Sequence, residues 1–540
     1  MRAVRLSKSK IIGGMQCPRR LWFEVHRPDL AVYDAVTMSS FAGGHQVGAM
    51  ARQLYPGGIL VESQKNLSQA VRQTQAILAG KRDTVVFEGA FRHRDVLVRA
   101  DVLVRAGGRC RLVEVKSATR VKPYHIDDAA IQAWVVGGAG VRLEAVAVSH
   151  VDTRWVYAGD GDYRGLLREV DVTAEVQPRL QGLPDLVRGF QAMVAGARPV
   201  VTTGKQCSQP FSCPFFAVCS GEEGAVSSAV AAVTCPPPVA GAVSSATRRL
   251  LADLPYPRAF LDFETVNPAI PLWAGTRPYE QAPFQWSCHL ERYAGAPVEH
   301  AEFLAHGDDD PRRAFAESLL ALLGEHTGDE AGGGGSDDAG VGDNGDDNVG
   351  DDAGAGPVFV YGSFEASRLR ELAVRFPDLA PPLDALSCRL VDLLPVVQQG
   401  YSCPGMKGYS LKVVLPTIAP HLSYDGLEQV YDGVSAQQAF LELIGHALPD
   451  ADGRPSGPPA AGQPSGSQAA GGSRVDLPAA GPEPEQLSFA SDADGQPTGA
   501  PAVESVEQRR AGLRQALLAY CQRDTLALVE LVAYLEGRPS

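Results

Sequence analysis

Three polar side chains in the first part of the chain have the types and spacing that bind divalent metal ions. Asp101 lies in one apolar stretch, and Glu114 and Lys116 lie in the next one. Residues i and i+2 of a strand point to the same face of a sheet, so Glu114 and Lys116 project together. Two carboxylates suit Mg²⁺ or Mn²⁺, and a neighbouring lysine stabilises charge that develops during displacement at phosphorus. The pattern predicts metal-dependent phosphodiester chemistry; an ordinary hairpin with an exposed Glu-x-Lys pair is the alternative.

A second set of acidic residues lies in the other half of the chain. Asp262 and Glu264 follow an apolar run at the same i, i+2 spacing and supply half of a two-metal site. Glu365, at a strand-to-helix junction, and Asp524, near the C-terminus, are candidates for the other half. Tyr520 precedes Asp524 by four residues on a long expected helix, so the two share one face. The alternative is that these acids cap a strand or face solvent.

The cysteines of the first part are spaced like metal ligands. Cys207, Cys213 and Cys219 recur as C-x5-C-x5-C among prolines and aromatic residues, and Cys17 lies near the N-terminus. With Cys17 as the fourth thiolate they can hold a [4Fe–4S] cluster, and Zn²⁺ would take the same four ligands. Unrelated buried thiols are the remaining interpretation. Ten cysteines in 540 residues are too few for a disulfide scaffold and indicate a reducing compartment.

Charge is distributed unevenly along the chain. The net charge is −14, yet residues 1–225 contain 29 lysines and arginines against 21 aspartates and glutamates. Nine acidic residues, with no lysine or arginine among them, lie between Asp329 and Asp352. The first part is therefore basic in its own right, which favours a nucleic-acid partner. Neither a long apolar run nor an N-terminal signal sequence is present, so we expect a cytoplasmic protein with no membrane partner.

Apolar periodicity predicts the elements that position these residues. The expected strands and helices of the first part cover residues 85–91, 97–104, 111–119, 126–136 and 141–151, of which 126–136 is the helix. Gly107 and Gly108 predict the turn that brings Asp101 beside Glu114. A strand over 258–266, a strand-to-helix unit over 358–373 and a helix over 517–535 are expected in the second part. Both parts are predicted to be α/β.

Three segments have compositions that do not support a packed core. Residues 222–250 are rich in small residues and proline and are expected to form a linker between domains 1–221 and 251–540. Residues 328–356 and 449–505 are expected to be disordered insertions in the second domain. Lys412, between those insertions, is interpreted as a surface lysine, with contact to a substrate phosphate as the alternative.

The first domain resembles the RecB-like branch of the PD-(D/E)xK nucleases, in particular the CRISPR-associated exonucleases with iron–sulfur cysteines. The likeness rests on His45 after two glycines, Glu88 with Gly89, Asp101, the Glu114-Val115-Lys116 triplet, Gln132 and the four cysteines. It implies a restriction-endonuclease-like mixed sheet flanked by helices. It also implies that His45, Asp101 and Glu114 bind metal, that Lys116 and Gln132 are catalytic, and that Tyr124 lies at the edge of the site. Cys207 departs from the spacing usual in the family, and Ala100 replaces the proline of the motif.

The second domain resembles the DnaQ-like exonucleases of the DEDD type, which have an RNase H-like α/β fold. The likeness implies that four carboxylates bind two Mg²⁺ or Mn²⁺ ions and that Tyr520 orients the attacking water. These carboxylates are Asp262, Glu264, Glu365 and Asp524. Glu365 stands where such enzymes usually carry aspartate, which puts one metal position in question.

The arrangement of both domains also resembles an uncharacterised bacterial two-nuclease family. The resemblances imply a hydrolase with two phosphodiesterase sites, a DNA exonuclease in repair or defence, with helicase partners left undefined. Two alternatives remain open. One is a nucleic-acid-binding or assembly module in which one or both sites are inactive. The other is an RNA-processing exonuclease, because no feature of the sequence reads a 2′-hydroxyl.

Overall fold

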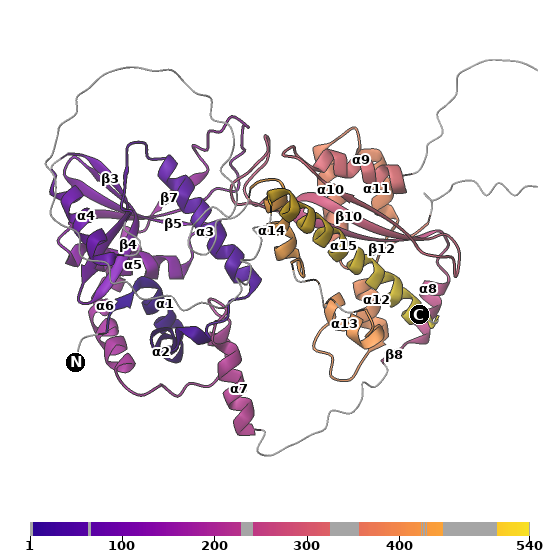
Figure 1. Cartoon of the computed structure of the whole chain (residues 1–540), viewed down its shortest axis with the longest axis horizontal. Coiled ribbons are helices and arrows are strands. Elements are labelled where there is room, and N and C mark those ends of the chain that lie inside the picture. Colours follow the sequence, from indigo (N-terminus) through magenta and orange to yellow (C-terminus); the bar gives the residue numbers. More distant parts are fainter. Residues whose placement is uncertain are drawn as a thin grey trace, which may run out of the picture.

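The computed structural model describes most of the chain as two lobes (Figure 1). The described residues are 4–62, 66–80, 82–227, 241–324, 356–422, 424, 427, 429–446 and 505–538. Nearly all of the segments 328–356 and 449–505 that the sequence predicts to be disordered lie outside these residues, as do residues 228–240 of the predicted linker. Each lobe contains a mixed β-sheet flanked by helices, so the α/β class predicted from the sequence is confirmed.

The N-terminal lobe is built on a seven-stranded sheet. Its strands are β1 (Leu6–Ser7), β2 (Ile59–Leu60), β3 (Thr84–His93), β4 (Val96–Ala106), β5 (Arg109–Lys116), β6 (Leu143–Val151) and β7 (Leu167–Asp171). They are ordered β2-β3-β4-β5-β6-β7, and β1 pairs with β4. The pairs β1/β4, β2/β3 and β5/β6 are parallel, whereas β3/β4, β4/β5 and β6/β7 are antiparallel.

The hairpin that the sequence predicts between β4 and β5 is present. Gly107 and Gly108 form its turn with φ values of 57° and 79°, a region that glycine enters without a steric penalty. Val102 pairs with Val113 across the hairpin. The preceding residue of β4, Asp101, therefore lies beside Glu114 on β5, and both project from the same face of the sheet.

Helices cover both faces of this sheet. They are α1 (Lys8–Gln16), α2 (Pro18–His26), α3 (Ala35–Gln53), α4 (Leu67–Ala79), α5 (Pro123–Gly138), α6 (Thr173–Val194) and α7 (Phe216–Ser227), with short 3₁₀ helices at Pro28–Leu30 and Lys205–Cys207. Helix α5 packs across β3, β4 and β6, on the face from which Glu114 projects, and α3 packs against β5. Helix α7 extends into the segment that the sequence predicts to be a linker.

The C-terminal lobe is built on a five-stranded sheet ordered β11-β10-β9-β12-β13. These strands are β9 (Arg258–Val266), β10 (Ala282–Glu291), β11 (Glu299–Leu304), β12 (Val358–Val360) and β13 (Leu390–Asp392). The first three strands form an antiparallel meander, and β12 and β13 are added in parallel on the other side of β9. Strand β9 is therefore central and buried. A separate pair, β8 (Ala242–Val243) and β14 (Tyr401–Ser402), is antiparallel.

Two groups of helices sandwich this second sheet. The helices of the lobe are α8 (Ser245–Ala252), α9 (Arg312–Leu323), α10 (Phe364–Arg375), α11 (Ala380–Cys388), α12 (Leu393–Gly400), α13 (Leu411–Ile418), α14 (Gly433–Leu443) and α15 (Val506–Glu536). Leu261 and Phe263 of β9 belong to one apolar core with α9, α10 and α11. Phe260 packs on the opposite face against the end of α15. Alternation along β9 consequently directs Asp262 and Glu264 towards α15.

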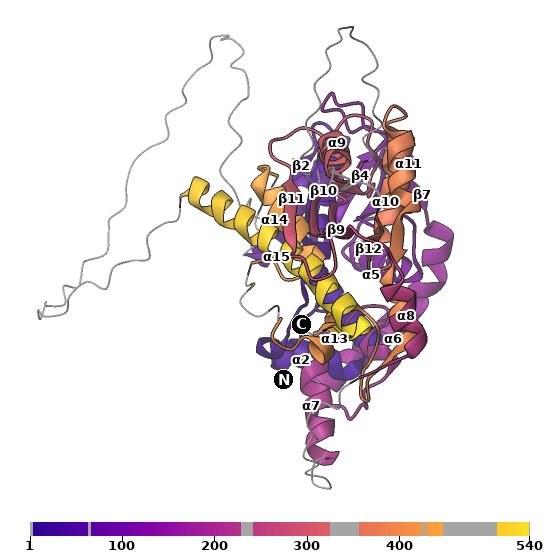
Figure 2. The same cartoon turned by 90° about the vertical axis from the view of Figure 1, so that its right-hand side faces the viewer.

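Helix α15 runs obliquely over the sheet for 31 residues (Figures 1 and 2). Ser505 begins it with a capping box, in which its hydroxyl accepts from the Gln508 amide at 3.1 Å. Gly537 ends it with φ 81°. Buried polar contacts fix its position on β10, because the Gln285 amide group donates to the Leu517 carbonyl at 2.8 Å.

The two lobes touch through paired loops rather than through the chain connection alone. The Tyr157 amide donates to the Thr276 carbonyl at 2.9 Å, and the Gly275 amide donates to the Tyr157 carbonyl at 2.7 Å. The Tyr279 hydroxyl donates to the Ser117 carbonyl, directly after β5. None of the described helices combines the length and apolar character that crossing a lipid bilayer requires.

Arg258 ties three elements of the C-terminal lobe together. It is only 1 % exposed, its Nη1 atom lies 2.7 Å from Oε1 of Glu536, and its Nη2 atom donates to the Leu251 and Leu254 carbonyls. We predict that Arg258→Ala lowers the free energy of unfolding by about 3 kcal/mol, because removing one partner leaves a buried carboxylate undercompensated. This predicted loss is at the low end of the range for breaking a buried ion pair, because Arg538 still contacts Glu536.

Urea unfolding followed by tryptophan fluorescence measures this loss. Arg292→Ala is the matched control, because the Arg292–Glu299 pair lies on the surface at 43 % and 52 % exposure. We expect the control to change stability by less than about 1 kcal/mol. Equal effects of the two substitutions would contradict the structural role of Arg258.

Candidate functional site

Three carboxylates meet above the centre of the second sheet. Asp262 and Glu264 come from β9 and Asp524 comes from α15, and one oxygen of each lies within 4.8 Å of the others. Glu264 and Asp524 are buried, at 8 % and 9 % exposure, and Asp262 is half-buried. We call these three residues the carboxylate centre. In the described part of the chain, they form the one group of acidic, histidine or cysteine side chains close enough to hold a metal ion.

Mutual repulsion and burial perturb these groups. Burial and the charges of Asp524, Glu365 and Glu264 raise the pKa of Asp262 well above its usual value. Burial and the charge of Asp524 also raise the pKa of Glu264 to about 8. Like charges in a region of low dielectric favour the protonated state unless a cation neutralises them. Hard oxygen donors are the ligands that Mg²⁺ and Mn²⁺ prefer, so the donor set fits a divalent cation.

Glu365 lies beside the carboxylate centre but outside the close group of three. It occupies the first turn of α10, after Gly362, whose φ of 107° directs the chain into the helix. The side chain is 3 % exposed, and its Oε2 atom has no hydrogen-bond partner among the described residues. Burial raises its pKa to about 8. A buried carboxylate oxygen without a donor is costly, and a bound cation would satisfy it.

Tyr520 approaches the same centre from one turn before Asp524. Its side chain is 3 % exposed, and its hydroxyl accepts a hydrogen bond from Nζ of Lys412 at 3.1 Å. The Tyr424 hydroxyl donates to Oδ1 of Asp524. The Lys412 ammonium group lies 4.9 and 5.0 Å from the Tyr520 and Tyr424 ring centroids, within cation–π distance.

Sequence reasoning therefore missed two residues at this centre. Lys412 is exposed over much of its length, as expected of a surface lysine, yet its ammonium group reaches Tyr520. The sequence gives no local signal for the contact between Lys412 and Tyr520, because 108 residues separate them. Tyr424 lies in a segment without apolar periodicity, so the sequence gives no local signal that it lies near Asp524.

The N-terminal lobe brings a second set of charged residues together. Glu114 of β5 is 1 % exposed, and its Oε1 atom lies 2.7 Å from Nζ of Lys116. The Gln132 side chain, on α5, donates to Oε2 of Glu114. Oδ2 of Asp101 accepts from the Val115 amide at 2.8 Å. The structure thus assembles four of the residues that the sequence predicts for this site.

Two further residues complete this N-terminal site. Nζ of Lys8, on α1, lies 2.8 Å from Oε1 of Glu114 and 3.3 Å from Oδ1 of Asp128. Asp128 also pairs with Lys116. Sequence reasoning missed both, although Asp128 precedes Gln132 by four residues on α5 and so shares its face.

The electrostatic state of this site differs from that of the carboxylate centre. Burial alone would raise the pKa of Glu114, but the ammonium groups of Lys116 and Lys8 outweigh it and hold this pKa below its usual value. Both oxygens of Glu114 have protein donors, so a metal ion there has to displace one of them. Asp101 is the exception, because burial and the charge of Glu114 raise its pKa to about 8.

Two residues assigned by resemblance lie outside this cluster. His45, on α3, is exposed and does not form a close ligand group with Asp101 and Glu114 in the described residues. Tyr124 lies at the edge of the site, as expected, in a cleft of about 630 Å³ between the lobes. This interlobe cleft is lined by Lys116, Ser117, Lys122, Tyr124, His125 and Asp128 on one side and by Asn267, Pro268, Tyr279, Val434, Gln437 and Leu441 on the other.

The four cysteines predicted as ligands line one small cavity between α2, α7 and the loop before α7. They are Cys17, Cys207, Cys213 and Cys219, and all are free thiols. Among the described residues, no three of these sulfur atoms lie within 4.8 Å of one another. A tetrahedral zinc site with Zn–S distances of about 2.3 Å needs closer sulfurs. The sulfur positions therefore do not match a tetrahedral zinc site as they stand.

A comparison with known families finds a match to part of the C-terminal lobe. The model of a domain family described as a domain of unknown function, DUF2779, matches residues 259–410. The match includes Asp262, Glu264 and Glu365 and ends before α15, which carries Tyr520 and Asp524. No curated protein sequence matches the chain.

We predict that the stability of the metal-free protein falls as the pH rises from about 4.3 to about 8. Glu264 and Glu365 titrate near 8 in the folded state, whereas glutamate in an unfolded chain titrates near about 4.3. The folded state thus binds more protons across this interval, and its advantage disappears as these groups ionise. Thermal denaturation in EDTA at a series of pH values measures the slope.

Added Mn²⁺ should counteract this loss by binding the carboxylate centre. At a concentration of 100 times its Kd, a ligand specific for the folded state stabilises it by about 2.7 kcal/mol. Asp262→Asn should abolish the Mn²⁺ shift, because one of the three carboxylate ligands is lost. An equal Mn²⁺ shift in parent and variant would exclude binding at this centre.

Proposed function

We propose that the protein is a metal-dependent nuclease whose principal active site is the carboxylate centre. The observation that carries the proposal is the close group of Asp262, Glu264 and Asp524, with the orphan oxygen of Glu365 beside it. Carboxylates that gather from separate elements are typical of two-metal phosphodiester cleavage. The likeness to DnaQ-like exonucleases agrees with this chemistry and suggests DNA, degraded from an end, as the substrate.

The residues around the carboxylate centre have distinct proposed roles. Divalent cations, when bound, would activate water and stabilise the charge that develops on the phosphate. Asp262, Glu264 and Asp524 would hold them, with Glu365 as a fourth donor. The Tyr520 hydroxyl would orient the attacking water, and Lys412 would fix that hydroxyl in place. Tyr424 would restrict Asp524 to one orientation through its hydrogen bond.

The N-terminal site is proposed as a second nuclease centre that requires a rearrangement before it acts. Lys8, Lys116 and Gln132 already satisfy Glu114. Movement of Lys8 away from Glu114 would free one carboxylate oxygen for a cation, with Asp101 as its partner. Lys116 would then stabilise the developing charge. The observed contacts equally favour a second function, in which this lobe binds nucleic acid in the interlobe cleft without cleaving it.

The four cysteines are proposed to bind a [4Fe–4S] cluster, with Zn²⁺ as the alternative. Their arrangement around one cavity supports the proposal, because Cys17 comes from the start of the chain and the other three from the end of the lobe. Metal ligation would join these distant segments and couple metal binding to folding. We propose a cytoplasmic location, in which such thiols stay reduced before cluster assembly.

We predict that the purified protein degrades end-labelled DNA only with Mg²⁺ or Mn²⁺ and that Asp262→Asn lowers kcat by roughly 100-fold or more. Tyr520→Phe should lower kcat by about 100-fold, because the hydroxyl that positions water is lost. The assay is gel electrophoresis of single- and double-stranded DNA, with RNA of the same sequence in parallel to decide between the two nucleic acids.

Controls separate the two sites. Asp378→Asn removes a carboxylate at 55 % exposure in the same lobe and should leave the rate unchanged. Lys116→Ala reports on the N-terminal lobe: a lower kcat would assign this lobe to catalysis, and a higher KM with unchanged kcat would assign it to binding. Cleavage by an Asp262→Asn/Lys116→Ala double variant at the parental rate would refute the nuclease proposal.

A separate prediction concerns the cysteine cavity. Protein purified without oxygen should be brown and contain iron and acid-labile sulfide, and Cys219→Ser should lose both because a thiolate ligand is missing. Cys388→Ser is the control, because Cys388 is exposed and lies outside the cavity. Colourless protein that contains stoichiometric zinc would replace the cluster with a zinc site, and protein without either metal would refute ligation.

A further inference from the structure

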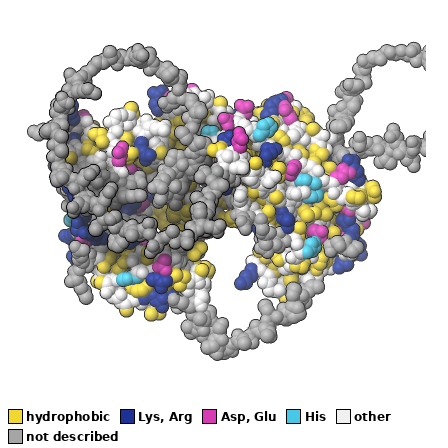
Figure 3. All heavy atoms as spheres, in the orientation of Figure 1, with side chains coloured by type: hydrophobic (Ala, Val, Ile, Leu, Met, Phe, Trp, Pro, Cys, Tyr) yellow, Lys and Arg dark blue, Asp and Glu magenta, His cyan; other side chains and the backbone are white. Residues whose placement is uncertain are grey.

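A second concave site lies on the C-terminal lobe and is rich in arginine. It is a pocket of about 650 Å³, and the charged residues that line it are two glutamates, Glu280 and Glu371, and five arginines, Arg277, Arg312, Arg368, Arg370 and Arg375. We call it the arginine pocket. On the face of the lobe seen in Figure 3, lysine and arginine side chains are interspersed with aspartate and glutamate, whereas the pocket has five arginines against two glutamates.

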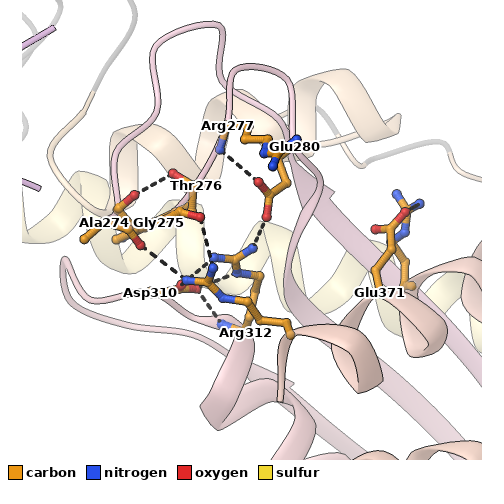
Figure 4. Close-up of polar contacts among 11 residues, drawn as sticks. Ala274, Gly275, Thr276, Arg277, Glu280, Asp310, Arg312 and Glu371 are labelled. Atoms are coloured by element: carbon orange, nitrogen blue, oxygen red, sulfur yellow. Dashed lines mark hydrogen bonds and ion pairs between the residues drawn. The ribbon is translucent and has the colours of Figure 1, made fainter. Parts of the chain in front are cut away.

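Two of the five arginines build the frame of the pocket. Arg312 binds Asp310 through two nitrogens, at 2.9 and 2.6 Å, and also pairs with Glu280 (Figure 4). Arg375 donates to the Gly275 and Ala274 carbonyls at 2.9 and 3.3 Å. These contacts fasten the loop before β10 to α9 and α10. The guanidinium groups that remain are consequently presented on a fixed surface.

The other three arginines retain hydrogen-bonding capacity. Arg277 and Arg370 are exposed, and neither side chain has an ion-pair partner within the described parts of the chain. Arg368 is only 8 % exposed, and one of its Nη atoms donates to Glu371 at 2.6 Å. Its Nε atom is buried and has no hydrogen-bond partner among the described residues. A buried donor without an acceptor is unfavourable, so an acceptor supplied by a ligand would stabilise Arg368.

The position of Arg368 connects the pocket to the carboxylate centre. Arg368 follows Glu365 by three residues on α10, so both side chains lie on the same face of that helix. One of them has a buried acceptor without a donor, and the other has a buried donor without an acceptor. A group that is negatively charged and also approaches a bound cation would satisfy both. A phosphate group has this property, and arginine binds it with two parallel hydrogen bonds.

We infer that the arginine pocket binds a phosphate group of the nucleic-acid strand whose scissile bond lies at the carboxylate centre. The inference rests on the proposed function and adds to it a binding site on the strand. The phosphate can belong to an internal phosphodiester or to a phosphorylated end of the strand. In either case, the pocket anchors the strand and thereby positions the bond to be cleaved.

An equilibrium binding experiment tests this inference without cleavage. Internally labelled oligothymidylate is titrated with full-length protein in EDTA, and fluorescence anisotropy is measured at several salt concentrations. The variant is Arg277→Ala/Arg370→Ala, which removes only exposed side chains, and Arg292→Ala is the control outside the pocket. We expect Kd to rise about tenfold in the double variant. The slope of log K against log salt should decrease by about 0.7 for each phosphate that the variant no longer neutralises.

Three forms of the oligonucleotide distinguish the source of the phosphate. They carry a 5′-phosphate, a 3′-phosphate or hydroxyls at both ends. An equal loss of affinity for all three forms indicates an internal phosphodiester. A loss confined to one phosphorylated form indicates the corresponding strand end. Unchanged affinity and unchanged salt slope for all three forms would overturn the inference.

A small substrate separates this inference from the proposed function. Bis(p-nitrophenyl) phosphate has no neighbouring phosphate, so the double variant should hydrolyse it at the parental rate, whereas KM for DNA should rise about tenfold with little change in kcat. If the double variant hydrolyses the small substrate at the parental rate and also binds DNA like the parent, the inference about the arginine pocket is overturned. The nuclease proposal is then unaffected. Absence of hydrolysis by the parent would count against the nuclease, and the binding titration would still decide whether the pocket holds phosphate.

Discussion

Repulsion among buried carboxylates is the constraint on which the C-terminal lobe depends. Asp262, Glu264 and Asp524 lie within 4.8 Å of one another, and without a cation each disfavours the ionisation of the others. The surrounding elements hold these groups together against that repulsion. Strand β9 is paired on both sides, and α15 is anchored at Gln285. Strongly perturbed carboxylates in such a rigid frame are typical of sites prepared for a charged ligand.

In the N-terminal lobe, lysine side chains compensate the charge of the buried carboxylate. Lys8 and Lys116 neutralise Glu114, so the charge of this carboxylate is already compensated by protein groups. Binding of a divalent cation would therefore have a different electrostatic effect in the two lobes. At the carboxylate centre it relieves repulsion, whereas at Glu114 it competes with an ammonium group. Affinity for divalent ions should accordingly differ between the lobes, although both present acidic residues from neighbouring strands.

Local sequence patterns predicted the parts of both sites that depend on regular geometry. The i, i+2 spacing placed Asp262 and Glu264 on one face, and the glycine pair set the hairpin that joins Asp101 to Glu114. Contacts made by packing between distant segments left no such signal. Lys8 reaches Glu114 across 106 residues, and Tyr424 reaches Asp524 across 100. Asp128 was recoverable in principle, because it shares a helical face with Gln132, but an acid on a helix is usually solvated.

The hydrogen bond from Tyr279 to the Ser117 carbonyl has a consequence for how the chain can change through evolution. It joins a loop of the C-terminal lobe to Ser117, the residue that follows Lys116. The contact between the two lobes therefore lies next to a residue of the N-terminal site. A half taken from a relative would have to match this loop pair as well as its own core. Recombination between such chains should therefore succeed at the connection between the lobes only when both loops are inherited together.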